Sequence, residues 1–302
     1  MTARVLLALG LGLGLGLGVG ATGCGPDVVE NGPKGPQIHR FAVLAAPRVK
    51  APSMPMPGRP GPRQGDRRAD ARARAEKPPD FSEAVSAIAT EPRLDFAVYL
   101  GPILDAPSPE DAAAAADEFK AVSAMISAPT YAALGVKDAE VQLPDLESAL
   151  GLPEGKRHYR VSPKPGLHLI GLDLSRGPVE GPQLQWLEGE LAKVPAGDRV
   201  VVVGADAVRA GSPAREALAR VPAVKLTVDP AASPADGGKT WTDGSGLQTV
   251  SAPGLEDGRY LVITIDEDTG RVEVRPIREP AGPGTAAPAE PTIVPLRKAP
   301  KP

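Results

Sequence analysis

The stretch LDFAVYLGPILD, residues 94–105, decides the fold class of this chain. Its apolar residues fall on both sides of an extended backbone, as expected for a strand buried on both faces within a parallel sheet. Gly101 and Pro102 end the strand and open a loop at its carboxyl end. In open α/β sheets, ligands and catalytic groups gather at that end. Here the loop offers Pro102, which has no backbone N–H group and no side chain able to bind a metal.

The composition indicates a globular chain with a sizeable aliphatic core. Its 302 residues suffice for one large domain or two small ones, and 42% of them are apolar. Aromatic residues make up only 3%, so the core is expected to consist mainly of Val, Leu, Ile and Ala. The formal net charge of −3 gives no indication of a nucleic-acid partner.

Residues 1–23 are predicted to be an export signal rather than part of the fold. Arg4 supplies a positive end, and a short Leu- and Gly-rich apolar run follows. Cys24, the one cysteine of the chain, comes directly after small residues, which resembles the lipobox of bacterial lipoproteins. That resemblance implies cleavage before Cys24, lipidation of this residue, and attachment to a membrane. Gly25 in place of Asp favours the outer membrane or periplasmic face over the inner membrane. The alternative is an ordinary secretory signal followed by an incidental cysteine.

Three Pro-rich segments are predicted to lie outside the packed core. Residues 24–37 are predicted to be a tether, and residues 279–302 a disordered Pro- and Ala-rich tail. Residues 50–79 form a Pro- and Arg-rich insert without apolar periodicity. This insert is either a solvated spacer or an electrostatic contact with anionic lipid or polymer near a membrane.

Between these segments, strands and helices alternate in a β–α–β manner. A helix is expected from residue 80, with Phe81, Val85, Ile88 and Ala89 on its buried face. Ser108 and Pro109 predict the start of a second helix. The other expected helices span residues 181–194 and 213–219. The expected strands span residues 41–44, 94–100, 130–134, 158–161, 167–172, 199–203, 224–228, 247–251, 259–266 and 271–277.

The order of these motifs over residues 38–278 resembles that of the calcineurin-like metallophosphoesterase superfamily. The resemblance rests on the segments YLGPILD, YAALGVKD, HYRVSPKPGLHLIGLD, RVVVVGADAV and VKLTVDPAAS, which stand where the family has its Gly-Asp, Gly-Asn-His-Asp, Gly-Leu-Asp, Gly-His and Gly-His-x-His segments. It implies an α/β fold, a four-layer α/β/β/α sandwich, with a two-metal site built from loops at the strand ends.

The residues at the family's metal-binding and catalytic positions have different chemistry in this chain. A two-metal site needs several nitrogen and oxygen ligands. Every matching position here lacks the imidazole, carboxylate or amide that the family uses. We therefore expect no bound metal and no other cofactor. The matching positions are Ala46, Arg48, Pro102, Val136, Lys137, Ala205, Ala231 and Ser233.

Two of these replacements are cationic, and they lead to a hypothesis about the former metal pocket. Arg48 and Lys137 are expected to project into it and to replace part of the lost positive charge, since buried charges must be paired. The acids expected to pair with them are Asp105, Asp138, Asp206 and Asp229. The alternative is that both cations point to solvent.

The chain's three histidines fall at none of the family's ligand positions. His168 lies on an expected strand and is interpreted as packed or hydrogen-bonded. No nucleophile elbow is present from which Ser-His-Asp catalysis would start.

Two classes of function follow from the sequence. The first is a membrane-tethered, non-catalytic binding or scaffolding module, whose partner is an envelope protein or an anionic ligand. The second is a divergent phosphoesterase that holds a hard divalent cation through the remaining aspartates.

Overall fold

The fold is described from a computed structural model in which residues 36–302 form one compact unit. Within it the structure describes residues 37–52, 77–204, 212–266 apart from 243 and 245, 269–278 and 290–297. Cys24 and the expected signal and tether up to residue 36 lie outside the described residues, as do residues 53–76 of the insert.

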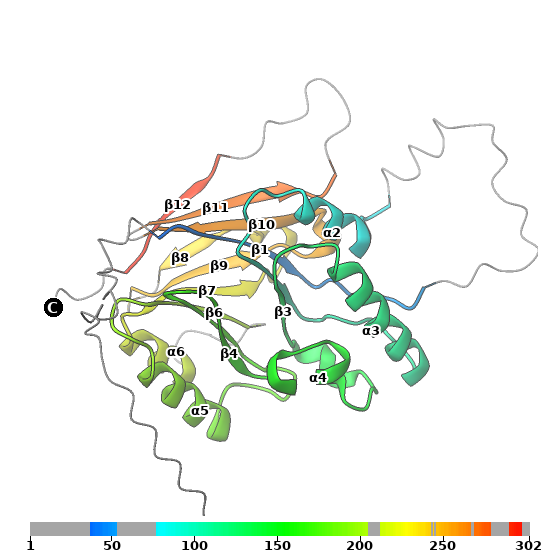
Figure 1. Cartoon of the computed structure of the whole chain (residues 1–302), viewed down its shortest axis with the longest axis horizontal. Helices are drawn as coiled ribbons and strands as arrows, with labels where there is room; N and C mark the ends of the chain where they lie inside the picture. Colours follow the sequence, from blue (N-terminus) through cyan, green and yellow to red (C-terminus); the bar gives the residue numbers. More distant parts are fainter. Residues whose placement is uncertain are drawn as a thin grey trace, which may run out of the picture. The chain divides into compact units, whose positions relative to one another are not determined.

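The first sheet contains the N-terminal strand at its centre. Its parallel pairs are β1–β2 and β2–β3, whereas β10, β11 and β12 join in antiparallel fashion. Because β1 pairs with both β2 and β10, the beginning and the end of the folded chain share one sheet (Figure 1). The strand order is β12 (Thr292–Pro295), β11 (Thr269–Pro276), β10 (Arg259–Ile265), β1 (His39–Ala45), β2 (Phe96–Leu100) and β3 (Thr130–Ala133).

The second sheet has a parallel centre and antiparallel edges. Strands β5, β6, β7 and β9 run parallel, while β4 and β8 pair antiparallel at the two ends. The strand order is β4 (Tyr159–Lys164), β5 (Leu167–Gly171), β6 (Arg199–Val203), β7 (Val224–Pro230), β9 (Gln248–Ala252) and β8 (Thr240–Thr242).

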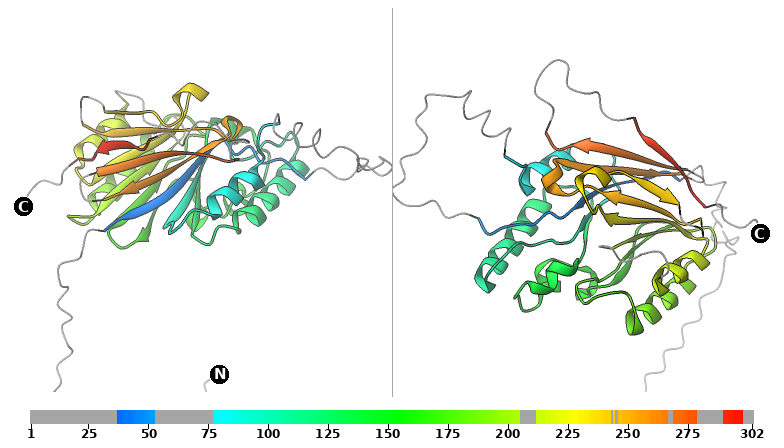
Figure 2. Two further views of the ribbon diagram at one scale, coloured as in Figure 1. Left: turned by 90° about the horizontal axis from the view of Figure 1, so that it is seen from above. Right: turned by 180° about the vertical axis from the view of Figure 1, so that it is seen from behind.

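Three buried clusters show that the two sheets stack face to face with helices outside them. Along β2, Phe96, Val98 and Leu100 belong to the cluster between the sheets, whereas Ala97 and Tyr99 belong to a cluster beneath helices. A strand that buries both faces needs apolar residues at every position, as residues 96–100 have. The expected four-layer α/β/β/α sandwich is therefore confirmed (Figure 2).

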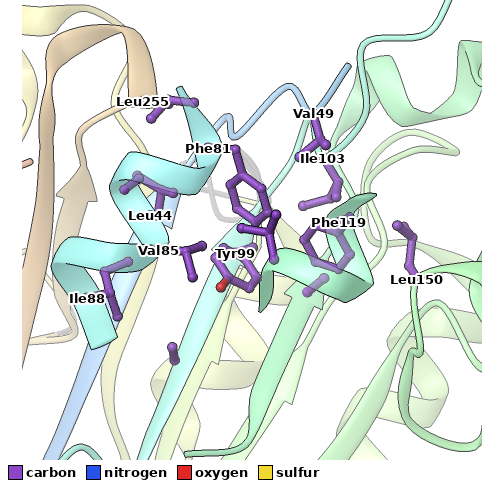
Figure 3. Close-up of a cluster of buried hydrophobic side chains, with 14 of the residues drawn as sticks. Leu44, Val49, Phe81, Val85, Ile88, Tyr99, Ile103, Phe119, Leu150 and Leu255 are labelled. Atoms are coloured by element: carbon purple, nitrogen blue, oxygen red, sulfur yellow. The ribbon is translucent and has the colours of Figure 1, made fainter. Parts of the chain in front are cut away.

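Helices on the outer face of each sheet complete the four layers. Asp80 caps α2 through the N–H group of Glu83, and Ser108 caps α3 through that of Asp111. The rings of Phe81, Tyr99 and Phe119 pack together with centroids 5.2–5.6 Å apart, joining α2 and α3 to β2 (Figure 3). The helices are α2 (Phe81–Ala89), α3 (Pro109–Ser123), α4 (Leu146–Ala149), α5 (Gly181–Ala192) and α6 (Pro213–Arg220).

Several features of the structure correct the sequence predictions. Ala89 is exposed, and Ala84 lies on the buried face of α2 instead. Strand β8 was not expected. The expectation of a disordered tail is wrong for residues 292–295, which form β12 beside β11, seen as red beside orange in Figure 2. Val294 of β12 is buried in the cluster between the sheets, which explains why this short segment adheres to the fold.

Candidate functional site

The loops that follow β1 and β2 run side by side at the carboxyl ends of the strands. The Arg48 N–H group donates to the Pro102 carbonyl at 3.2 Å, and the Val49 N–H group donates to the Ile103 carbonyl at 2.8 Å. The Asp105 N–H group returns a bond to the Val49 carbonyl at 2.9 Å. The two loops thus continue the parallel pairing of their strands and have a defined backbone.

Two residues of the first loop adopt the left-handed backbone region. Ala46 has a φ of 47° and Arg48 a φ of 45°. This region is unfavourable for residues with a Cβ atom, and each such residue costs on the order of 1 kcal/mol. The loop therefore keeps a strained conformation at a strand end, which is common at binding sites.

Replacing Ala46 by Gly is expected to stabilise the protein by about 0.5 kcal/mol. Gly removes the left-handed strain, and part of that gain is lost because Gly is more flexible in the unfolded chain. Ala45→Gly is the matched control, because Ala45 lies buried in β1 and should lose about 1 kcal/mol. Denaturant unfolding of both variants measures the difference, and equal destabilisation would show that Ala46 is unstrained.

Arg48 and Lys137 line one small cavity at this end of the strands. This cavity of about 180 Å³ also contains Pro102, Asp105 and Glu140 in its wall. The two cationic and two acidic side chains in this wall have formal charges that cancel. A neighbouring cavity of about 560 Å³ shares Arg48 and Asp105 and includes Ala46, Lys50 and Lys77.

The ion pairs at this face differ from those expected. Arg48 pairs with Glu256 at 4.0 Å, and Asp105 pairs with Lys50 at 3.3 Å. All four side chains are largely exposed, so these pairs contribute little to stability. The expectation that Arg48 would pair with Asp105 or Asp138 is therefore wrong. Arg48 and Asp105 instead take partners from other parts of the chain, Glu256 for Arg48 and Lys50 for Asp105.

Asp138 is a buried anchor for the loops. Only 1% of the residue is exposed. Its Oδ1 atom accepts the N–H group of Ile103 at 2.8 Å, and its Oδ2 atom accepts that of Gly135 at 2.8 Å. The carboxylate thus joins the loop after β2 to the loop after β3. Burial raises the pKa of this group to about 6, while the backbone N–H groups act in the opposite direction.

Two glycines allow this close approach of the loops. A Cβ atom on Gly101 would lie 2.2 Å from both Asp138 Oδ2 and the nitrogen of Gly135. A Cβ atom on Gly135 would lie 2.9 Å from the carbonyl carbon of Gly101. The structural need for Gly at these two positions is steric.

The remaining expected site residues do not all gather at the cavity. Val136 lies beside Lys137 and is largely exposed. Asp229 is buried in β7 of the second sheet, and Ala231 follows that strand with its N–H group bonded to the Ala252 carbonyl. Ser233 donates its hydroxyl group to Asp236 at 2.6 Å. Ala205 and Asp206 lie outside the described residues.

A buried polar cluster that was not predicted from the sequence lies next to these loops. Asp173 Oδ1 accepts both the N–H and the hydroxyl group of Ser175, and Gln183 bonds the backbone of Asp173 on both sides. Arg157 reaches Ser175 at 3.1 Å and also pairs with Glu147. The negative charge of Asp173 contributes to the raised pKa of Asp138. The signal that could have revealed the cluster is the Asp-x-Ser spacing directly after an apolar strand.

Within the described ranges, no three His, Cys, Asp or Glu side chains form a group that could hold a metal ion. In the same ranges, no helix has the length and apolar character needed to cross a membrane.

Comparisons with known proteins support the fold and leave the family open. No family model matches this chain, and no curated protein matches it. Among solved structures, GAP50, the anchor in the inner membrane complex of Plasmodium, is 10% identical with a TM-score of 0.52. The alignment covers 86% of this chain and 90% of GAP50. At this identity the likeness concerns the fold alone.

Two further structures match at lower TM-scores. Vps29 of Chaetomium thermophilum is 10% identical with a TM-score of 0.40, covering 87% of this chain and 97% of Vps29. An uncharacterised predicted phosphoesterase from Streptococcus pneumoniae is 9% identical with a TM-score of 0.33, covering 86% and 98%.

Proposed function

We propose that this chain is a binding or scaffolding module of a bacterial cell envelope, tethered to a membrane by lipid on Cys24. It performs no metal-dependent phosphoester hydrolysis at its strand ends. The tether and the placement at the outer membrane or periplasmic face rest on the sequence around Cys24. GAP50, which shares the fold, is described as an anchor, so this sandwich is compatible with an attachment role.

The chemistry of the strand-end loops carries the proposal. Ala46, Pro102 and Val136 have no atoms that could bind a cation, and Arg48 and Lys137 would repel one. The acids near them have other partners, since Asp138 accepts backbone N–H groups and Asp105 pairs with Lys50. A divalent ion would have to displace these contacts.

The same loops favour the binding of a partner. The two adjoining cavities share Arg48 and Asp105, so one ligand can reach both. Exposed cations at Arg48 and Lys50 alternate with exposed acids at Asp105 and Glu256. Such a mixed surface suits an envelope protein with complementary charges, and Arg48 with Lys137 suits an anionic group on that partner.

Two experiments test the proposed function. The first measures bound metal and phosphodiesterase turnover, and the second measures capture of a partner. Purified full-length protein is expected to carry less than one divalent ion per chain and to show no phosphodiesterase turnover with added Mn²⁺. Two tightly bound ions per chain, with turnover that Asp105→Asn and Asp229→Asn abolish, would establish the divergent phosphoesterase instead.

The second experiment uses the charge-reversed double variant Arg48→Glu/Lys137→Glu. Capture of an envelope partner from solubilised membranes is expected to fall at least 10-fold for this variant. Lys193→Glu is the matched control, because Lys193 is an exposed cation after α5, on the helix layer of the second sheet. Equal capture by both variants would exclude the strand-end face as the contact surface.

A further inference from the structure

Ser162, His168 and Asp198 form a hydrogen-bonded chain on the second sheet, away from the strand-end cavities. Ser162 Oγ lies 2.8 Å from His168 Nδ1, and His168 Nε2 lies 2.9 Å from Asp198 Oδ2. Ser162 belongs to β4, His168 to β5, and Asp198 to the connection between α5 and β6. Three segments of the chain thus contribute one side chain each.

The local structure explains why these side chains meet. Val161 pairs with Leu169 across the β4–β5 hairpin, and the register shifts between Val161 and Lys164. Ser162 therefore lies at an irregularity next to His168. Leu167 and Leu169 face the cluster between the sheets, so His168 faces the opposite side, where Asp198 precedes β6.

The hydrogen bonds determine the tautomer of His168. An ionised Asp198 can only accept a hydrogen bond, so Nε2 of a neutral His168 carries the proton. Nδ1 is then unprotonated and accepts the hydroxyl proton of Ser162. This leaves an imidazole nitrogen ready to act as a general base toward the serine, with its orientation fixed by a carboxylate.

The solvent exposure of the three side chains fits a reactive serine. Ser162 is exposed, whereas His168 is only 8% exposed and Asp198 is partly buried. The serine can meet a substrate while the other two stay in place. The other two histidines lack this arrangement, since His39 lies 3.6 Å from Asp95 and His158 packs against Trp186.

We propose that Ser162 is a nucleophile for acyl transfer from small activated esters, with His168 as its general base and Asp198 as the residue that positions His168. Ser162 Oγ forms a bond to the acyl carbon while its proton moves to His168 Nδ1. The bond from the acyl carbon to the leaving oxygen then breaks, and His168 returns the proton to that oxygen. A water molecule then attacks the acyl carbon and gives a proton to His168 Nδ1. The bond from the acyl carbon to Ser162 Oγ breaks, Oγ takes the proton from His168, and the carboxylic acid is released.

The ring nitrogens are used in the opposite sense from the Ser-His-Asp template, in which Nε2 faces the serine and Nδ1 the aspartate. Either nitrogen of a neutral imidazole can accept a proton, so the reversed use preserves the acid–base chemistry. This activity is separate from the proposed binding function, because none of the three residues lines the strand-end cavities.

The test treats the full-length protein with a fluorophosphonate probe and, separately, with p-nitrophenyl acetate. We expect one adduct per chain, located by peptide mass spectrometry at Ser162, and slow release of p-nitrophenol. Ser162→Ala should abolish the adduct, and His168→Gln should slow its formation about 100-fold. Ser86→Ala is the control, because Ser86 is an exposed serine in α2 and its loss should change nothing.

Asp198→Asn is a second variant, which keeps the test decisive if His168→Gln fails to fold. The amide keeps the shape of the side chain but favours the wrong tautomer, so labelling should fall about 10-fold or more in a chain with unchanged thermal unfolding. Absence of an adduct at Ser162 in the native chain, or equal labelling of the native and Asp198→Asn chains, would overturn the proposal. The three residues would then only fasten the β4–β5 hairpin to the following strand.

Discussion

Replacing Gly101 by Ala is expected to destabilise the protein by at least about 3 kcal/mol. The added methyl group would lie 2.2 Å from Asp138 Oδ2 and from the nitrogen of Gly135, and neither atom belongs to a flexible side-chain end with free space around it. To remove these clashes, the loops after β2 and β3 must move apart, and this movement breaks the buried hydrogen bonds of Asp138. Overpacking and loss of buried hydrogen bonds each cost about 1–3 kcal/mol.

Gly189→Ala is the matched control for this variant. Gly189 lies exposed in α5, and a Cβ atom there would meet nothing within 4 Å. Because Ala has the higher helix propensity, this variant should gain up to about 1 kcal/mol. Denaturant unfolding separates the two, and a loss below about 1 kcal/mol for Gly101→Ala would show that the loops adjust at little cost.

Replacing Asp138 by Asn is expected to destabilise the protein by about 3 kcal/mol at pH 5. At this pH the folded Asp138 is mostly the neutral acid, and both of its oxygens can still accept an N–H group. The amide of Asn has a single acceptor oxygen, so its NH₂ group would face the N–H group of Gly135 or of Ile103. An unsatisfied buried donor is costly. Asp105→Asn is the control, because the exposed Asp105–Lys50 pair should contribute less than about 1 kcal/mol.

The penalty of Asp138→Asn should depend on pH. The pKa of Asp138 is raised from 3.8 in the unfolded chain to about 6 in the folded chain, mainly by burial. Between these values the folded chain binds more protons than the unfolded chain, so the contribution of this group to stability is present below about pH 4 and lost as the pH rises through 6. Each pKa unit corresponds to about 1.4 kcal/mol.

The measurement is the difference in unfolding free energy between the native chain and Asp138→Asn. This difference should shrink by about 2–3 kcal/mol between pH 4 and pH 6.5. A difference that grows with pH would mean that the backbone N–H groups keep the folded carboxylate ionised and outweigh its burial.

The pattern of apolar residues predicted the main strands and helices, because each of them buries a regular set of positions. Residues 199–203 were expected as a strand and form β6 with the same bounds, since a Val run that is buried on both faces leaves no ambiguity. Strand β12 could not be found in this way. It has four residues within a Pro- and Ala-rich segment, and pairing with β11 together with burial of Val294 and the adjoining Leu296 holds it in place.

The candidate site was predictable in position but not in its contacts. The resemblance to the metallophosphoesterase motifs singled out the loops that hold Arg48 and Lys137, and both residues line one cavity. The structural role of Asp138 was not foreseen, because its partners are backbone N–H groups, one of them on Ile103, 35 residues earlier in the chain. A sequence pattern shows which side chains are present. It does not show which backbone N–H groups will donate hydrogen bonds to a buried carboxylate.

The central position of β1 has a consequence for synthesis. This strand is the first of the described strands to leave the ribosome, yet one of its two neighbours is β10, about 200 residues later. Until residues 259–265 emerge, the edge of β1 has no partner, and unpaired apolar edges aggregate. Completion of the first sheet is therefore a late event, and it joins segments so distant that closure should be slow. A nascent chain that stalls before residue 259 presents the unpaired edge of β1 to any chaperone or neighbouring chain nearby.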